Sequence, residues 1–134
     1  MAKWSYGIHS TPLDMVREFA TKMSQPLDQP WDTDWPNTDN LDNLRGTLIQ
    51  EEFDEFMLED KDEVAALKEL ADLVYVCYGY AATFGWDLDE AVKRVHESNM
   101  SKLGDDGKPI YREDGKVQKG PNYKKPNLED LVKK

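Results

Sequence analysis

Two neighbouring acidic motifs between Leu48 and Leu73 constrain this chain more than any other feature. Upstream of the first motif, Leu41, Leu44 and Leu48 recur at helical spacing, as expected of a helix face that packs on a core. The same face continues with three glutamates, at positions four, seven and eleven residues after Leu48: Glu52, Glu55 and Glu59. Carboxylates therefore stand where the periodicity predicts a core.

The second motif lies in the most apolar segment of the chain, residues 64–84. Nearly every residue there is apolar or small, so we expect a helix that is buried on most sides. Its only charged residues are Lys68, Glu69 and Asp72, and the two acids share a face because they are three residues apart. Buried carboxylates are costly unless they are paired, protonated or bound to a metal. Since residues 46–60 contain no lysine or arginine, a divalent cation is the simplest partner for both motifs.

The remaining pattern predicts a single-domain, all-α protein with four main helices. We expect the second helix to begin after a cap at Asp39 or Asn40. The turn before Glu63 is short, so the second and third helices should be antiparallel neighbours with their acidic sets face to face. The four helices are expected over residues 12–24, 41–58, 63–84 and 88–100.

The charge of the chain, −10 in total, is unevenly distributed. Residues 1–100 hold 8 basic and 21 acidic side chains, whereas residues 101–134 hold 9 basic and 6 acidic. The acidic body argues against a nucleic-acid polymer as a ligand, because binding a phosphate backbone needs a basic surface. It suits a metal-bridged polyphosphate that lysines approach from the other side.

The basic tail has its own expected secondary structure. An Asp114-Gly115 turn predicts a small hairpin, and residues 128–132 predict a short helix.

Cysteine content and hydropathy point to the cytoplasm. The single cysteine, Cys77, lies in the middle of the apolar helix, where a small buried hydrophobe is more plausible than a nucleophile. One cysteine allows no intrachain disulfide, which fits a reducing compartment. The longest apolar run, residues 73–84, is too short and interrupted to span a bilayer, and no signal-peptide pattern is seen. We expect a cytoplasmic protein without a membrane partner.

The donor set of the two motifs selects the kind of cation. Four or five carboxylates without a nearby histidine or cysteine favour a hard ion, Mg²⁺ or Mn²⁺. Because Mg²⁺ is usually shared with substrate phosphates, the expected ligand is a nucleotide polyphosphate. The first motif alone, Glu51-Glu52-x-x-Glu55, is more often a solvated acidic face. The second, Glu69-x-x-Asp72 on an apolar neighbour, makes a metal site the favoured interpretation.

Further segments complete a pattern around these motifs, at residues 73–79, 95–103, 106–109 and 114–123. Together they resemble the MazG-like all-α nucleoside triphosphate pyrophosphohydrolases. The run Ser98-Asn99-Met100-Ser101-Lys102 and the later Asp-Gly-Lys-Val run resemble the branch that acts on dUTP and other deoxynucleoside triphosphates, including phage members. The resemblance implies an antiparallel four-helix bundle with an irregular, short-hairpin tail, oligomerising through its helices.

The resemblance also implies an activity, the hydrolysis of a nucleoside triphosphate between its α and β phosphates to a monophosphate and pyrophosphate. Four acids, Glu52, Glu55, Glu69 and Asp72, would hold one or more Mg²⁺ ions. Glu51 would orient or deprotonate the attacking water. Substrate-binding candidates at the end of the fourth helix and in the tail are Asn99, Lys102, Tyr111, Lys116 and Lys119.

Two tryptophans in the polar loop after the first helix need shelter from water. Trp31 and Trp35 either pack on the helices or stack on a ligand base, so Trp31 is also a substrate-binding candidate.

We expect residues 1–103 to form a helical catalytic part and residues 104–134 a basic tail that completes the nucleotide site. The third helix is too apolar for three partner helices and a tail to cover, which predicts a homodimer or a dimer of dimers. A non-catalytic nucleotide- or alarmone-binding regulatory protein of the same fold is the alternative. An acidic interaction protein would be favoured only if metal binding were absent.

Overall fold

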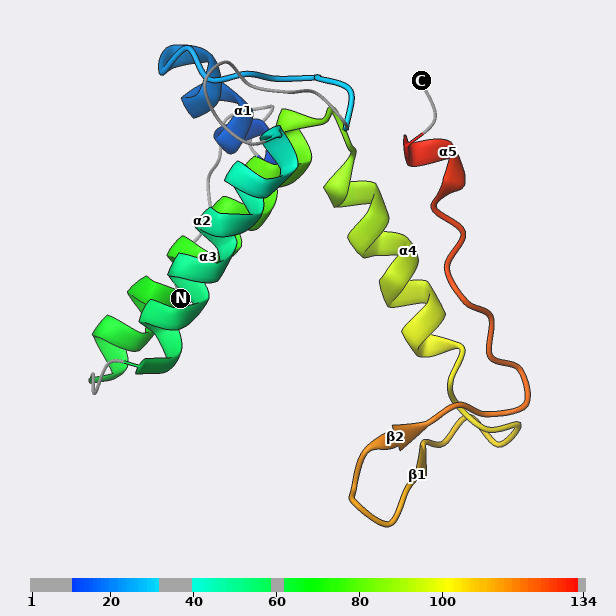
Figure 1. The fold of residues 1–134 in the computed structure, drawn as a ribbon. Helices are drawn as coiled ribbons and strands as arrows, with labels where there is room; N and C mark the ends of the chain where they lie inside the picture. The colour runs from blue at the N-terminus through cyan, green and yellow to red at the C-terminus, as the bar shows by residue number, and fades with distance from the viewer. Residues whose placement is uncertain (1–10, 32–39, 59–61, 133–134) are drawn as a thin grey trace. The chain divides into compact units, whose positions relative to one another are not determined.

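The computed structural model describes residues 11–31, 40–58 and 62–132 of the chain. These residues form five helices and one two-stranded sheet (Figure 1), which confirms the predicted mostly helical class. The elements are α1 (Pro12–Lys22), α2 (Leu41–Leu58), α3 (Glu63–Thr83), α4 (Leu88–Met100), β1 (Ile110–Tyr111), β2 (Val117–Gln118) and α5 (Glu129–Val132). The helix bounds agree with the predicted ones to within two residues. No described helix is both long and apolar enough to cross a membrane.

The chain divides into two compact units, Met1–Leu88 and Asp89–Lys134. The first holds α1, α2 and α3, and the second holds nearly all of α4 with the tail. Since α4 belongs to the second unit, a single four-helix bundle stays a prediction. The functional division at residue 103 also stays a prediction.

Helix α1 starts from a reciprocal cap and packs on α3. The Asp14 amide donates to Oγ1 of Thr11 at 3.1 Å, and the Thr11 amide donates to the Asp14 carboxylate at 3.3 Å. The helix buries Leu13 and Val16 against Ala82 of α3, and this contact forms a small apolar core.

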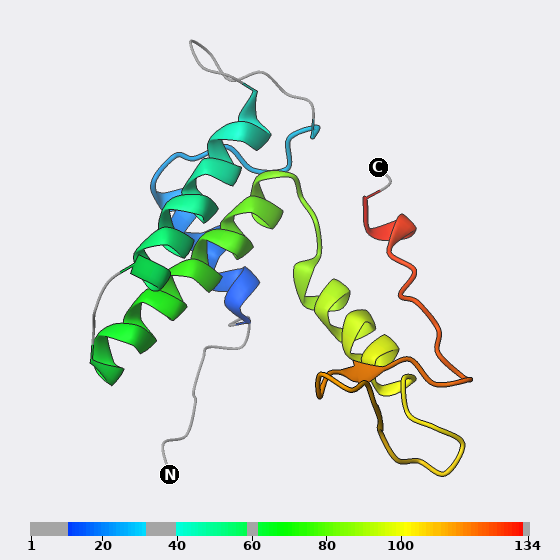
Figure 2. The ribbon, with the colours of Figure 1, turned by 60° about the horizontal axis from the view of Figure 1, so that its bottom comes forward.

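Helices α2 and α3 are antiparallel neighbours, as predicted (Figures 1 and 2). Helix α3 begins at a cap in which Asp62 accepts from the Ala65 amide at 2.8 Å, and it gives way to a left-handed Gly85 with φ of 70°. The cap of α2 was predicted at Asp39 or Asn40. The Asn40 carbonyl accepts from the Leu44 amide, as that of an N-cap residue does, but its Oδ1 is buried without a hydrogen bond, so Asn40 provides no side-chain cap. Asp39, like Glu59 and Trp35, lies outside the described residues.

Burial of α3 is concentrated near its C-terminal end, whereas the sequence predicted burial on most sides. Within this chain its buried residues are Glu69, Gly79, Ala81, Ala82 and Thr83. The physical reason is length, because the 11 residues of α1 cover only part of the 21 residues of α3. Large apolar side chains therefore remain exposed along the first half of α3: Val64, Leu67, Leu70 and Val74.

In the second unit, the tail returns alongside α4 (Figure 1). The predicted hairpin is confirmed, with Ile110 opposite Gln118 and a left-handed Gly115 in its turn. Ser98 donates from Oγ to the Lys124 carbonyl at 2.7 Å and so fixes the tail to α4. The predicted C-terminal helix is present as α5.

Candidate metal centre

Three carboxylates from α2 and α3 converge on one point. One oxygen from each of Glu52, Glu69 and Asp72 lies within 4.8 Å of the others. Helix α2 supplies the first, and the others stand three residues apart on one face of α3. Glu69 is buried and the other two are half-buried. Antiparallel pairing of two helices thus places both acidic motifs face to face.

Glu55 belongs to the same group of acids. The charge of Glu52 is the largest of the causes that raise the pKa of Glu55, and a hydrogen bond with Glu69 raises it further. Glu51, in contrast, is exposed and stands one position around the helix from Glu52. The structure therefore brings four of the five predicted acids together.

The acids fit a hard divalent cation. Oε2 of Glu52 and Oε2 of Glu69 are both buried and accept no hydrogen bond. Leaving a buried carboxylate oxygen unpartnered is costly, and direct coordination of an ion by oxygen would satisfy both atoms. The donors are all carboxylate oxygens, the ligand type that Mg²⁺ and Mn²⁺ prefer.

A lysine of α3 supplies positive charge to this cluster. Nζ of Lys68 lies 2.7 Å from Oδ2 of Asp72 and 3.7 Å from Oε1 of Glu69. A hydrogen bond with Asp72 is the largest cause of a raised pKa of Lys68. The pairing of Lys68 with these acids was not predicted, because a basic partner was expected only among residues close to the first motif. The four-residue spacing of Lys68 and Asp72 was the available signal.

Trp31 packs on the C-terminal end of α3. Its Nε1 donates to the Tyr80 hydroxyl at 2.8 Å, and its ring centre lies 6.4 Å from that of Trp86. Of the two interpretations of this residue, the structure shows the packing contact. Its side chain is still 56% exposed, so a face of the ring remains accessible.

The other predicted substrate-binding residues all lie in the second unit. Asn99 is exposed in the last turn of α4, and Lys102 is half-buried just beyond it. Tyr111 and Lys116 stand on the hairpin, where both are exposed, and Lys119 places Nζ 4.6 Å from the ring centre of Tyr123. The acids belong to the first unit, so a common site for the two sets stays a prediction.

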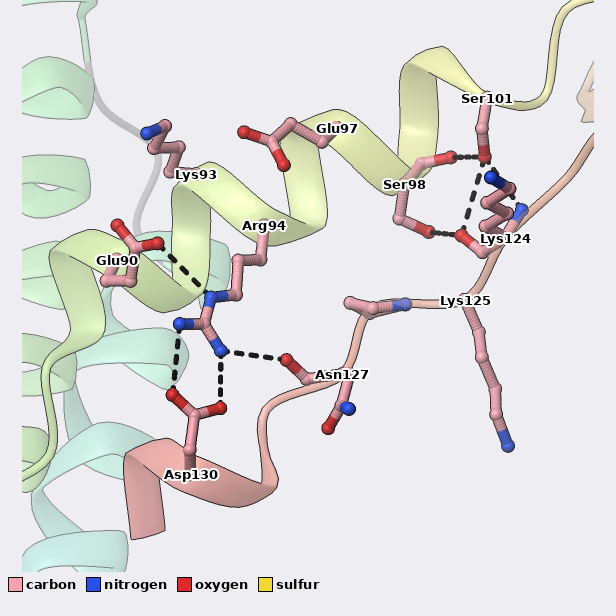
Figure 3. Close-up of a pocket in the computed structure, with 11 residues that line it drawn as sticks. Glu90, Lys93, Arg94, Glu97, Ser98, Ser101, Lys124, Lys125, Asn127 and Asp130 are labelled. Atoms are coloured by element: carbon pink, nitrogen blue, oxygen red, sulfur yellow. Dashed lines mark hydrogen bonds and ion pairs between the residues drawn. The ribbon is translucent and has the colours of Figure 1, made fainter.

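The second unit contains a cavity of about 560 Å³ between α4 and the returning tail (Figure 3). Arg94 closes one side of it, binding the Asp130 carboxylate at 2.6 and 3.1 Å and the Asn127 carbonyl at 3.0 Å. Its Nε also donates to Glu90 at 3.2 Å. Through these hydrogen bonds Arg94 fixes the tail to α4.

The fold and the acidic cluster define a class, that of helical proteins with a carboxylate cluster between antiparallel helices that could hold a metal ion. Residues 16–99 match the family model described as phosphoribosyl-ATP pyrophosphohydrolase, and the chain belongs to that family. The family lies within the MazG-like all-α superfamily, as the sequence motifs indicated. Its members are pyrophosphohydrolases that act on nucleotide phosphoanhydride bonds and generally depend on a divalent metal. A search of curated proteins gave no match.

Proposed function

We propose that this chain hydrolyses (deoxy)nucleoside triphosphates between the α and β phosphates, using Mg²⁺. The products are a nucleoside monophosphate and pyrophosphate. One observation carries the proposal. In a chain of a pyrophosphohydrolase family, two buried carboxylate oxygens, on Glu52 and Glu69, accept no hydrogen bond where α2 and α3 face each other. The run around Asn99 favours dUTP and other deoxynucleotides as the first substrates to test.

The acids divide between two roles in this proposal. Glu52, Glu55, Glu69 and Asp72 hold the ion. When bound, Mg²⁺ offsets charge on phosphate oxygens and lowers the pKa of a bound water. Glu51, exposed beside the cluster, orients or deprotonates the attacking water.

Residues beyond the acidic cluster bind the substrate in our proposal. Lys102 supplies a positive charge for phosphate, and Asn99 supplies hydrogen bonds. Trp31 offers its exposed ring face. Secondary contacts come from Tyr111, Lys116 and Lys119.

We also propose that the protein is a homodimer or a dimer of dimers and that α4 completes a four-helix bundle with α1, α2 and α3. The exposed apolar side chains Leu67, Leu70 and Val74 on α3 support pairing between subunits, since patches of this kind mark interaction surfaces.

We further propose a cytoplasmic location. The single cysteine of the chain is compatible with a reducing, cytoplasmic compartment.

A product assay tests the activity. The protein is incubated with Mg²⁺ and each ribo- and deoxynucleoside triphosphate, and with phosphoribosyl-ATP because the family carries that name. We expect monophosphate and pyrophosphate. In ¹⁸O-labelled water, label in the monophosphate indicates attack at the α phosphorus. A nucleoside diphosphate with orthophosphate would contradict the proposal.

Matched variants connect the activity to the cluster. Glu52→Gln and Asp72→Asn should each lower kcat at least about 100-fold, because each removes a charged ligand of the ion. Glu63→Gln, on an exposed acid in the first turn of α3, should leave kcat unchanged. Nucleotide or alarmone binding without turnover by the unaltered protein would instead favour the non-catalytic alternative.

A further inference from the structure

Arg45, on α2, is the one arginine of this chain without a described partner. Arg17, Arg94 and Arg112 each bind an aspartate, at 2.8, 2.6 and 2.7 Å respectively. Nε of Arg45 is buried and makes no hydrogen bond. Burial lowers the pKa of Arg45, and among the described residues no carboxylate opposes that effect. Arg45 is half-buried, and leaving a buried N–H donor such as its Nε without an acceptor is costly, so this side chain needs one.

The guanidinium of Arg45 lies over Gly79 of α3. A Cβ at position 79 would overlap Nη2 of Arg45, so the glycine makes room for it. Beside it lies a cavity of about 100 Å³, whose other walls include Phe19, Leu48 and Tyr75. The rings of Phe19 and Tyr75 meet edge to face, with centres 5.8 Å apart. Most walls of the cavity are thus apolar or aromatic, and its polar walls are the guanidinium of Arg45 and the amide of Gln25.

The cavity and the acidic cluster lie along the same seam between α2 and α3. Arg45 precedes Glu52 by seven residues, two helical turns, so the two side chains share a face about 10 Å apart along the axis. On the antiparallel α3, Gly79 follows Asp72 by the same interval. Because the two helices are antiparallel, these two intervals run in the same direction in space. Arg45 and Gly79 therefore lie at the same end of the seam, two helical turns from the acids.

We propose that Arg45 binds an acceptor on the nucleobase of the substrate, with the base in this cavity and the phosphates at the acidic cluster. The proposal rests on the proposed function and names a residue that determines its specificity. Guanidinium groups donate only, and their fork matches carbonyl and ring-nitrogen acceptors of bases. Aromatic and apolar walls suit a flat ring better than a phosphate.

The volume of the cavity narrows the class of base. About 100 Å³ holds roughly three water molecules, which favours the single ring of a pyrimidine over a purine. Arg45 would then donate a hydrogen bond to a carbonyl oxygen of that ring.

Binding of non-hydrolysable analogues separates this proposal from the catalytic one. Calorimetry with Mg²⁺ measures the Kd of α,β-imido-dUTP, of α,β-imido-dATP and of the abasic deoxyribose analogue with the same triphosphate bridge. For Arg45→Met we expect a Kd for α,β-imido-dUTP about 10- to 100-fold higher and an unchanged Kd for the abasic analogue. Arg17→Met, which removes a guanidinium paired with Asp28 on the surface, should change neither.

One further variant and one stability measurement complete the test. Gly79→Ala leaves Arg45 in the chain but displaces its guanidinium, so it should weaken α,β-imido-dUTP binding selectively as well. Because a half-buried cation without a described partner stabilises little, Arg45→Met should leave Tm unchanged or raise it. A lower Tm together with unchanged binding of α,β-imido-dUTP would show a structural role and overturn the proposal.

Other outcomes also decide the matter. Equal weakening of the dUTP and abasic analogues by Arg45→Met would place the contact on phosphate, and tighter binding of the dATP analogue would overturn the pyrimidine assignment. Failure of the unaltered protein to bind any of the analogues would overturn both proposals. Selective binding of α,β-imido-dUTP through Arg45, without turnover of dUTP, would overturn the activity alone and support the role of Arg45.

Discussion

Nζ of Lys68 lies 2.7 Å from Oδ2 of Asp72, one turn further along α3, and 3.7 Å from Oε1 of Glu69. This ammonium group partly neutralises acids that α2 and α3 bring together. Its side chain is 65% exposed, so it can leave the cluster at little cost. Lys68 is therefore positioned to compete with a divalent cation for the Asp72 carboxylate.

The Lys68→Met variant should bind Mn²⁺ more tightly, by a factor of about two to five, because a competing charge is removed. Titration monitored by electron paramagnetic resonance measures the affinity. Lys22→Met, on an exposed lysine of α1, is the matched control and should behave like the unaltered protein. Weaker Mn²⁺ binding in Lys68→Met would show that the lysine supports the ion.

Phe84 is fully buried against Tyr80 and Trp86, whose ring centres lie 5.1 and 5.5 Å from its own. Phe84→Ala should lower the free energy of unfolding by about 3–5 kcal/mol, through lost burial and a residual cavity. Urea denaturation measures it. Val117→Ala, at an exposed hairpin position, should change it by less than about 0.5 kcal/mol.

Cys77 should react slowly with alkylating reagents. Burial raises the pKa of its thiol, so at pH 8 a smaller fraction is thiolate than in a free cysteine. The rate with iodoacetamide should be well below that of the urea-unfolded protein and should rise as pH increases. Equal rates in the folded and unfolded protein would contradict this.

Self-association should depend on the exposed apolar face of α3. Leu67 is 67% exposed within the chain, and a charge placed there would oppose pairing of apolar surfaces. Leu67→Glu should shift the protein to monomer in sedimentation velocity, whereas Val132→Glu, on α5, should not. A monomeric unaltered protein would remove the proposed assembly.

Arg94 should anchor α5 through Asp130 and Asn127. Arg94→Met should increase amide hydrogen exchange at residues 129–132 several-fold, because these contacts fix the short helix to α4. Arg112→Met, which loses a contact local to the hairpin, should leave that exchange unchanged. Unaltered protection of α5 in Arg94→Met would show that other contacts hold the tail.

Helix positions followed from the sequence because periodic apolar residues and helix breakers act locally. Leu88–Met100 was predicted as found, and Gly85 marked the end of α3. The facing acids also followed, since glutamates at Glu52 and Glu55 interrupted an apolar stripe. A short turn then required antiparallel helices.

The partners of single cations did not follow from the sequence. Lys68 is the only basic residue of α3, and Arg45 is the only basic residue of α2. Because a single basic side chain on a helix is usually solvated, their spacing from other residues was a weak indication of a partner. Only the packed helices show that Lys68 contacts the acids and that Arg45 lies, half-buried, over Gly79. Asn40 has good capping chemistry, yet tertiary packing buries its side-chain oxygen without a hydrogen bond.

The most direct test of the account is Mn²⁺ binding to Glu69→Gln, measured beside the unaltered protein and Glu63→Gln. Glu69 is the buried acid of the cluster, and one of its oxygens has no partner. We predict a site in the unaltered protein and in Glu63→Gln that weakens at least about tenfold in Glu69→Gln. Equal Mn²⁺ affinity in all three proteins would contradict a metal centre between α2 and α3.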